Sequence, residues 1–454
     1  MNISSLNKIY FLGVGGIGMS ALARYFLAQG KEVLGYDKTK TELTEQLEKE
    51  GIKIHYNEDV DFVSQHFSKE DGNHLICYTP AIPKDNIEFN YFQNNGIKLY
   101  KRSQVLGLIS QNYFTIAIAG THGKTTTSSI VAHILNASNI NCIAFLGGIS
   151  LNFNSNLVLN NEAEIMVVEA DEYDRSFLTL SPDIALITSL DADHLDIYGD
   201  NSQMLNAYKD FVKCIKPNGK LITKTDYQKT FAGVDISTYS LKEQADTFSE
   251  KIAVKNGAYY ADISSNNKTI KEVEIGLPGI HNVENAIGAF AIANQLGVSH
   301  EQIKAALLSY KGVKRRFEYH IKQENLVYID DYAHHPSELR MCILSVKELY
   351  PNRKITGIFQ PHLYSRTRDF AEEFAQSLSL LDELILLDIY PARELPIDGV
   401  TSHIILDKVT IKSKIVVTKS DLIQHLQNKE IEVLLTLGAG DIDTLINPIK
   451  KMLA

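Results

Sequence analysis

Hydrophobic and polar positions along the chain follow one repeating pattern, in which short apolar runs alternate with longer segments of helical periodicity. This alternation is typical of α/β domains, where helices join the strands of a parallel sheet. The pattern restarts at "YFTIAIAG", which begins at Tyr113, and again near Lys311. We therefore expect three α/β domains, at residues 1–110, 111–311 and 312–454, of which the first and third are Rossmann-like.

One stretch departs from this pattern. From about residue 224 to 276, the segments "STYS", "GAYYADIS" and "KEVEIGLPG" are short, β-rich and flanked by polar residues. Short β-rich segments between polar residues favour antiparallel strands, so we expect a small antiparallel appendage on the central domain. A helix-like run, "HNVENAIGAFAIANQLG", follows it, with Gly297 placed as a C-terminal cap.

Composition narrows the class of protein. The chain has 454 residues, of which 44% are hydrophobic and 22% charged, as in ordinary globular domains. The net charge of −10 argues against a general nucleic-acid binder. The four cysteines form no C-x-x-C pair, so metal knuckles are not expected and a reducing compartment fits. No apolar run resembles a secretory signal or spans a bilayer, so we expect a cytoplasmic protein that acts without a membrane.

A glycine loop stands near the start of the chain. In "YFLGVGGIGMS", Gly13, Gly15 and Gly18 have the spacing G-x-G-x-x-G between a strand-like and a helix-like run. Asp37 follows at the end of "EVLGYD". Glycine amides and a helix N-terminus in this order bind a pyrophosphate, and the acid binds a ribose. Taken alone, this loop predicts an NAD-dependent oxidoreductase.

A second loop, "AIAGTHGKTTT", leaves that prediction incomplete. Gly123, Lys124 and Thr125 again lie between a strand and a helix-like run, as in a phosphate-binding P-loop. Backbone amides can cradle phosphate, the lysine can reach the outer phosphates, and the threonine can bind Mg²⁺. The loop is shorter than a standard Walker A motif, because Gly120 stands closer to Gly123 than that motif requires. On this loop alone, a P-loop ATPase that acts on a protein partner also remains possible.

Acids follow the next two apolar runs. Glu169 comes directly after "IMVV", where a P-loop enzyme has the carboxylate that helps to hold Mg²⁺. Asp171, Glu172 and Asp174 follow closely and could equally form a solvated acidic loop. His194 lies within "DADHLD", so its carboxylate neighbours make a second metal site plausible.

The ordered series of motifs resembles the Mur ligase family. It comprises "GTHGKTTT", "VVEADEYDRSFL", "DADHLDIYG", "GIHNVENA", "RRFE", "DDYAHHPSE", "FQPHLYSRT" and "YPARE", and it covers nearly the whole chain. The resemblance implies a UDP-sugar-binding domain, a central ATPase domain and a C-terminal domain that binds the amino acid. In that case the first glycine loop holds the pyrophosphate of UDP instead of NAD, since the same backbone amides recognise either.

The resemblance also implies roles for individual residues. Those expected to bind ATP are Gly120, Thr121, His122, Gly123, Lys124, Thr125, Thr126, His281, Asn282, Asn285, Arg315 and Asp331. Those expected to bind the sugar nucleotide are Gly15, Gly16, Ile17, Gly18, Met19, Asp37 and Thr79. Thr125, Glu169 and His194 would hold the metal, and Tyr332, His334 and Arg366 the amino acid. The expected catalytic set is Lys124, His194, Arg316, His334 and Arg366.

The reaction implied is the ATP-dependent joining of L-alanine to the lactyl carboxylate of UDP-N-acetylmuramate, with Mg²⁺, in two ions, as cofactor. A monomer or weak homo-oligomer is expected. Tyr173 and Asp174 resemble instead a relative that reattaches a recycled tripeptide to the same sugar nucleotide, so that substrate remains an alternative. The motifs "DDYAHHPSE" and "PHLYSRTRD" favour the single amino acid.

Overall fold

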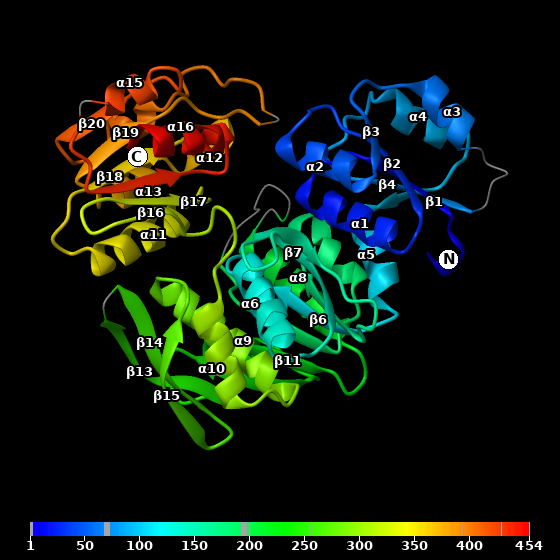
Figure 1. Cartoon of the computed structure of the whole chain (residues 1–454), viewed down its shortest axis with the longest axis horizontal. Coiled ribbons are helices and arrows are strands. Elements are labelled where there is room, and N and C mark those ends of the chain that lie inside the picture. Colours follow the sequence, from blue (N-terminus) through cyan, green and yellow to red (C-terminus); the bar gives the residue numbers. More distant parts are fainter. Residues whose placement is uncertain are drawn as a thin grey trace. The chain divides into compact units, whose positions relative to one another are not determined.

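The structure is a computed structural model that describes residues 3–67, 73–191, 198, 200–255, 257–392, 394–427 and 429–453. It contains three sheets, each accompanied by helices (Figure 1). The expected three-domain α/β architecture is therefore confirmed, while the exact domain boundaries stay a prediction. By internal contacts the chain forms two compact units, one of residues 1–251, 262–273 and 284–310, the other of residues 252–261, 274–283 and 311–454.

The first sheet is parallel throughout, in the order β3-β2-β1-β4-β5. Its strands are β1 (Lys8–Leu12), β2 (Glu32–Tyr36), β3 (Lys53–His55), β4 (His74–Tyr78) and β5 (Leu99–Lys101). Its helices are α1 (Ile17–Ala28), α2 (Glu42–Glu50), α3 (Val60–His66), α4 (Ile87–Asn94) and α5 (Arg102–Ser110). The strand order reverses at β1, and ligands bind at such a switch point in open α/β sheets. The glycine loop after β1 lies there.

The second sheet has ten strands in the order β15-β14-β13-β12-β11-β10-β6-β9-β7-β8. They are β6 (Phe114–Ala119), β7 (Cys142–Ser150), β8 (Ser155–Val158), β9 (Ile165–Glu169), β10 (Ile184–Ile187), β11 (Lys220–Lys224), β12 (Asp235–Ser240), β13 (Thr247–Lys255), β14 (Ala258–Ser265) and β15 (Lys268–Ile275). The helices are α6 (Lys124–Ala137), α8 (Asn201–Lys213), α9 (Ile280–Gln295) and α10 (His300–Ser309). Strand β6 pairs in parallel with β10 and β9, so the loop after it lies between their ends.

The antiparallel appendage is narrower than the sequence indicated. Strand β12, which contains "STYS", pairs in parallel with β11 and so extends the main sheet. Strands β13, β14 and β15 follow one another with two residues between each pair, a spacing that only antiparallel neighbours allow.

The third sheet has the order β16-β17-β21-β18-β19-β20, and only β16 runs antiparallel to its neighbour. Its strands are β16 (Glu318–Lys322), β17 (Val327–Asp331), β18 (Ile355–Phe359), β19 (Glu383–Leu386), β20 (Ser413–Val416) and β21 (Val433–Leu437). Its helices are α11 (Pro336–Leu349), α12 (Tyr364–Asp369), α13 (Ala371–Leu378), α14 (His403–Leu406), α15 (Leu422–Leu426) and α16 (Ile446–Leu453).

A buried polar contact fixes the first turn of α1 to the second sheet. The Arg24 guanidinium, 8% exposed, binds both carboxylate oxygens of Glu50 at 2.7 and 2.8 Å and donates to Asn156 of β8 at 2.5 Å. The Asn156 amide in turn donates to the carbonyl of Ile17 at 2.6 Å. Bidentate, charge-assisted bonds of this kind are strong and directional, so they set where the first glycine loop lies against β8.

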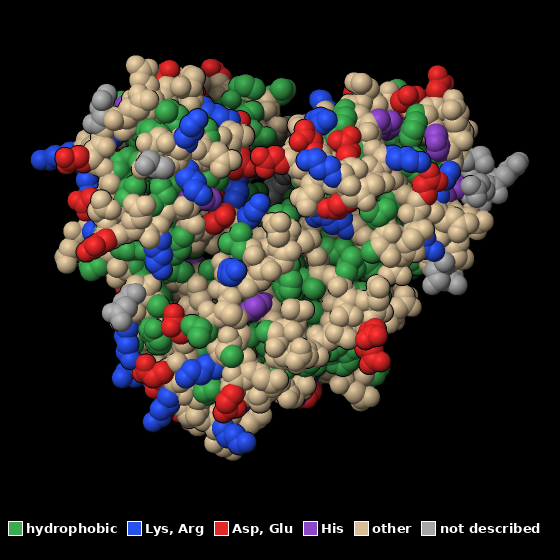
Figure 2. All heavy atoms as spheres, viewed as in Figure 1, with side chains coloured by type: hydrophobic (Ala, Val, Ile, Leu, Met, Phe, Trp, Pro, Cys, Tyr) green, Lys and Arg blue, Asp and Glu red, His purple; other side chains and the backbone are tan. Residues whose placement is uncertain are grey.

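The surface has no segregated charge on the face that Figure 2 shows, where Lys and Arg side chains are interspersed with Asp and Glu. Among the helices within the described ranges, none is long and apolar enough to cross a membrane.

Candidate active site

The first glycine loop is packed tightly against its neighbours. Gly13 has a φ of +86°, and a Cβ there would lie 2.6 Å from the Thr79 methyl group. The Gly15 amide donates to the Asp37 carboxylate at 2.8 Å, and the other Asp37 oxygen accepts from the Thr39 amide at 3.0 Å. Asp37 therefore closes the loop from the end of β2. Its predicted contact with the ribose stays a prediction.

The second loop places Lys124 at the first position of α6, directly after Gly123. Gly123 has a φ of +84°, which side chains rarely adopt, and a Cβ there would overlap the side-chain amide of Asn285. Asn285 therefore packs against this loop, and its predicted role in binding ATP stays a prediction. Thr126 is buried on the same helical turn.

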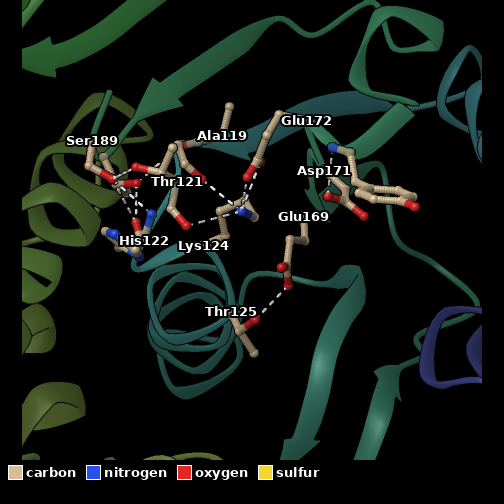
Figure 3. Close-up of polar contacts among 12 residues, drawn as sticks. Ala119, Thr121, His122, Lys124, Thr125, Glu169, Asp171, Glu172 and Ser189 are labelled. Carbon is tan, nitrogen blue, oxygen red and sulfur yellow. Dashed lines mark hydrogen bonds and ion pairs between the residues drawn. The ribbon is translucent and has the colours of Figure 1, made fainter. Parts of the chain in front are cut away.

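Lys124 is held inside the protein by a buried carboxylate. Its Nζ lies 2.8 Å from Glu172, whose side chain has no solvent exposure, and it donates to the carbonyl of Gly120 at 2.7 Å (Figure 3). Burial alone would lower the pKa of Lys124, but Glu172, Asp171 and Glu169 outweigh it and raise the pKa. The lysine is therefore a permanent cation at the phosphate loop. In the sequence Glu172 is one acid among several, because its burial has no signal there.

Thr125 and Glu169 form an oxygen pair at the start of α6 and the end of β9. The Thr125 hydroxyl donates to the Glu169 carboxylate at 2.9 Å, as Figure 3 shows. Beside them lies Gly147 of β7, where a Cβ would overlap that carboxylate and lie 2.8 Å from the Thr125 hydroxyl. The absence of a side chain at Gly147 thus leaves space beside two oxygen atoms. Hard oxygen ligands of this kind fit Mg²⁺. Gly147 was not predicted as a site residue.

The other side of the phosphate loop rests on residues after β10. The Ser189 hydroxyl bonds the Thr121 hydroxyl at 2.8 Å and accepts from the His122 amide at 2.8 Å. Thr188 donates to the carbonyl of His122 at 2.5 Å. These two residues hold the loop in shape. In the sequence their one signal is their place at the end of an apolar run, which alone does not mark a contact to this loop.

His194 was predicted to bind the metal and to act in catalysis. It lies outside the described residues, so both roles stay predictions. Asp191, just before it, has a carboxylate oxygen 3.8 Å from Nε2 of His122.

One cavity of about 310 Å³ joins the first glycine loop to the acids behind the second. Its lining comprises Gly16, Ile17, Gly18, Met19, Ala21, Thr79, Arg102, Leu106, Phe145, Leu146, Gly147, Val168, Glu169 and Asp171. Five predicted sugar-nucleotide residues and the predicted metal ligand Glu169 therefore share one cavity. Arg102, from the start of α5, was not predicted.

The remaining predicted residues, His281, Asn282, Arg315, Arg316, Asp331, Tyr332, His334 and Arg366, belong to the second unit. The two arginines there differ in their surroundings. Arg315 donates to Asp330 at 3.1 Å and to the carbonyls of Gly438 and Gly440 at 2.6 and 3.3 Å. It thus cross-links β17 to the end of β21. Its predicted role in nucleotide binding stays a prediction.

Arg316 sits in a strained turn. The flanking Arg315 and Phe317 have φ values of +62° and +50°, which cost energy in non-glycine residues and collect at functional sites. The Phe317 amide donates to Asp331 at 2.7 Å, which holds the turn. The Arg316 guanidinium lies 5.1 Å from the centre of the Tyr332 ring.

Asp331 and His334 both lie at the end of β17. Burial raises the pKa of Asp331 to about 6 against the opposing effect of Arg316 and of two backbone donors. Burial lowers the pKa of His334 against Glu338, so its imidazole is neutral near pH 7. Nδ1 of His334 lies 3.0 Å from the carbonyl of Tyr332 and 3.3 Å from Glu338. Two acceptors at Nδ1 place the proton there and leave Nε2 as the basic nitrogen.

The three other predicted residues of this unit lie on two elements. Burial lowers the pKa of His281, at the start of α9, to about 4. The Asn282 amide beside it donates to the carbonyl of Pro278 at 2.6 Å. Arg366, on α12, opposes protonation of His334, so these two predicted amino-acid-binding residues are electrostatic neighbours. Ser365, which precedes Arg366, donates hydrogen bonds from its amide and its hydroxyl to the carboxylate of Glu394, in the motif "YPARE".

A phosphate loop holds a buried lysine, and the strand-end carboxylate that contacts this loop also lines a cavity with a second glycine loop. This arrangement is that of an enzyme that brings a nucleotide to another anionic substrate. Comparison with known proteins identifies the family. Residues 8–114 match the Mur ligase family catalytic domain, residues 118–293 the Mur ligase middle domain, and residues 315–440 the Mur ligase glutamate ligase domain. The chain belongs to the Mur ligase family.

Similar proteins cover the whole chain. A curated UDP-N-acetylmuramate–L-alanine ligase of Parabacteroides distasonis is 51% identical over 100% of this chain and 98% of its own length. One of the same name from Cytophaga hutchinsonii is 48% identical over 100% and 98%. The crystal structure of UDP-N-acetylmuramate–alanine ligase from Thermotoga maritima matches with a TM-score of 0.83 and 29% identity over 98% of this chain and 99% of that one. These matches leave the NAD-dependent oxidoreductase unsupported.

Proposed function

We propose that this chain joins L-alanine to the lactyl carboxylate of UDP-N-acetylmuramate at the expense of ATP, in the cytoplasmic synthesis of peptidoglycan precursors. The observation that carries the proposal is the full-length identity of 51% to a curated relative of that activity. The site supports it, because Glu169 contacts the second glycine loop through Thr125 and lines one cavity with the first glycine loop. A carboxylate and an ammonium do not couple in water, so ATP has to activate the acid.

In the first step the lactyl carboxylate oxygen attacks the γ-phosphorus of ATP, and the bond to the β-phosphate oxygen breaks. The products are an acyl phosphate and ADP. Both reactants are anionic, so the cation of Lys124 offsets their repulsion and stabilises the transferred phosphoryl oxygens. We place Arg316 at the same phosphoryl group, since its turn is held rigidly by Asp331.

Thr125 and Glu169 would hold Mg²⁺, because they present hard oxygen ligands beside a glycine. When bound, the ion would supply further positive charge against the phosphates. A second ion at His194 belongs to the same proposal. The loop residues Thr121 and His122 keep the backbone amides in place through Ser189.

In the second step the amino nitrogen of alanine attacks the acyl carbon, and the bond from carbon to the phosphate oxygen breaks, which releases phosphate. The amine loses a proton as the amide forms. Nε2 of His334 is the proposed acceptor, since the lowered pKa keeps the imidazole neutral and Nδ1 already carries the proton. Arg366 is proposed to bind the alanine carboxylate with its planar fork.

The test is an ADP-release assay with ATP, Mg²⁺ and UDP-N-acetylmuramate, to which amino acids and the recycled tripeptide are added one at a time. We expect release with L-alanine and none with the tripeptide. The Lys124→Ala variant should lose nearly all activity, since removal of one positioned donor of this kind costs roughly 10²–10³-fold. Release with the tripeptide alone would transfer the assignment to the recycling reaction. Undiminished turnover in the variant would refute the role of the P-loop.

A further inference from the structure

In the part of the chain that the structure describes, the cavity that the first glycine loop shares with Glu169 is lined by two acidic side chains and one basic side chain. Its acids, Glu169 and Asp171, come from the end of β9. Among the described residues that line it, Arg102 is the only lysine or arginine. A sugar nucleotide brings a diphosphate into this cavity, and backbone amides alone offer no full positive charge to oppose it. Lys124 is already committed to the ATP side by its contact with Glu172.

Arg102 lies against the first turn of α1, where the first glycine loop ends. A Cβ placed on Gly18 would come within 2.8 Å of one guanidinium nitrogen and 2.9 Å of the arginine Cδ, so the side chain packs over the first turn of α1. That turn begins at Gly16 with no side-chain cap and contains no acidic residue. The amides of the turn and the guanidinium therefore converge at one place in the cavity.

Asp171 holds the guanidinium in this place without saturating it. The two groups are 3.6 Å apart, longer than the roughly 2.7–2.9 Å of a close bond between such charges. The Arg102 side chain is 25% exposed, so it is reachable from the cavity. An arginine fork can bond two phosphate oxygens in one plane, which a lysine cannot do.

We propose that Arg102 binds the diphosphate of the sugar nucleotide and that Asp171 positions it. The inference rests on the proposed function, because that function supplies the ligand. The guanidinium lies over α1, whereas the lactyl carboxylate has to reach the phosphoryl site at Lys124 and Glu169. Arg102 therefore acts in binding, and the chemical step belongs to other residues.

The experiment compares three ligands by calorimetry. UDP and UDP-N-acetylglucosamine carry the diphosphate without the lactyl group, and UDP-N-acetylmuramate carries both. Arg102→Ala should weaken all three by a similar factor of roughly 10- to 100-fold, the range for one hydrogen-bonded charge. Arg102→Lys should recover part of the loss. The KM for ATP and alanine should not change, and kcat should stay within about threefold of wild type, a split that a general structural defect would not produce.

Lys101→Ala is the matched control, because Lys101 precedes Arg102, pairs with Asp174 at 2.7 Å and does not line the cavity. It should leave all three affinities unchanged. A loss confined to UDP-N-acetylmuramate would assign Arg102 to the lactyl carboxylate, and unchanged affinities would remove it from the site. Either result overturns the inference while the proposed function stands. Failure of the wild-type protein to bind any of the three would instead refute the proposed function.

A measurement on the unaltered protein covers the case in which the variants do not fold. Phenylglyoxal modifies accessible guanidinium groups, and peptide mass spectrometry reads the modification at Arg102. UDP should slow modification of Arg102, and alanine should not. Equal rates with and without saturating UDP would overturn the inference.

Discussion

Replacing Glu172 by glutamine removes the negative charge that holds Lys124 in the nucleotide-free protein. The Glu172 side chain has no solvent exposure, and its carboxylate lies 2.8 Å from the lysine nitrogen. Removing one partner of a buried ion pair costs about 3–5 kcal/mol, because the other charge stays buried without it. Lys124 keeps the carbonyl of Gly120 at 2.7 Å, so we expect the lower end of that range, about 3 kcal/mol of unfolding free energy.

Urea denaturation followed by far-UV circular dichroism measures this loss. A non-hydrolysable ATP analogue should reduce it, because phosphates replace the carboxylate as partner of the lysine, and the variant should bind the analogue more tightly than wild type. Lys124→Met should also destabilise the protein, whereas the double variant should lose less than the sum of the two, since it leaves no buried charge unpaired. Additive losses, or a loss below about 0.5 kcal/mol for Glu172→Gln, would refute the reasoning.

Three further predictions concern the metal site, the acid dependence of stability and the amine step. Gly147→Ala should raise the Mg²⁺ concentration needed for half-maximal ligation, since its Cβ overlaps Glu169; an unchanged requirement would remove these oxygens from the metal site. Asp331→Asn should remove a pH-dependent part of the unfolding free energy. The pKa of Asp331 is about 6 in the folded protein and 3.8 ordinarily, so its protonation stabilises the folded protein at low pH. This contribution is lost as the pH rises through 6. From pH 6.5 to 4 the wild type should gain about 2 kcal/mol relative to the variant, and parallel denaturation profiles would contradict this. Arg366→Ala should raise the KM for alanine while hydroxylamine still traps the acyl phosphate; loss of the trapped hydroxamate with ATP and sugar binding intact would place Arg366 in the phosphoryl step.

Local motifs predicted the parts of the site that one short segment builds. The sequence placed Lys124 at a helix start and Glu169 at a strand end, and the structure has both there. Arg102 and Gly147 were missed because they meet the glycine loop and Glu169 only through tertiary packing. The difference between Arg315 and Arg316 was also beyond the sequence, since it depends on a positive φ and on carbonyls more than a hundred residues away.

Strand geometry explains the one difference in fold. "STYS" has the polar alternation of an exposed antiparallel strand, yet it lies beside β11 and continues the parallel sheet as β12. Alternation reports which faces of a strand are buried and carries no information about the direction of its neighbour. The antiparallel strands that follow were predicted from their short, β-rich, polar-flanked segments, and the two-residue connections in the structure exclude a crossover between them.

The shared cavity also bears on inhibition. One end is lined by Gly16, Ile17 and Gly18, and the other by Glu169 beside Gly147, within a volume of about 310 Å³. A fragment that mimics the diphosphate proposed at the first end and a fragment that chelates the metal proposed at Glu169 would each bind weakly. Joined by a linker of matching length, the second fragment would bind at an effective concentration in the millimolar range, so affinities would combine without any new contact. Such a linked compound would compete with both the sugar nucleotide and the ATP-bound metal. A resistance mutation at either end of the cavity would change a residue that the enzyme's own substrates need.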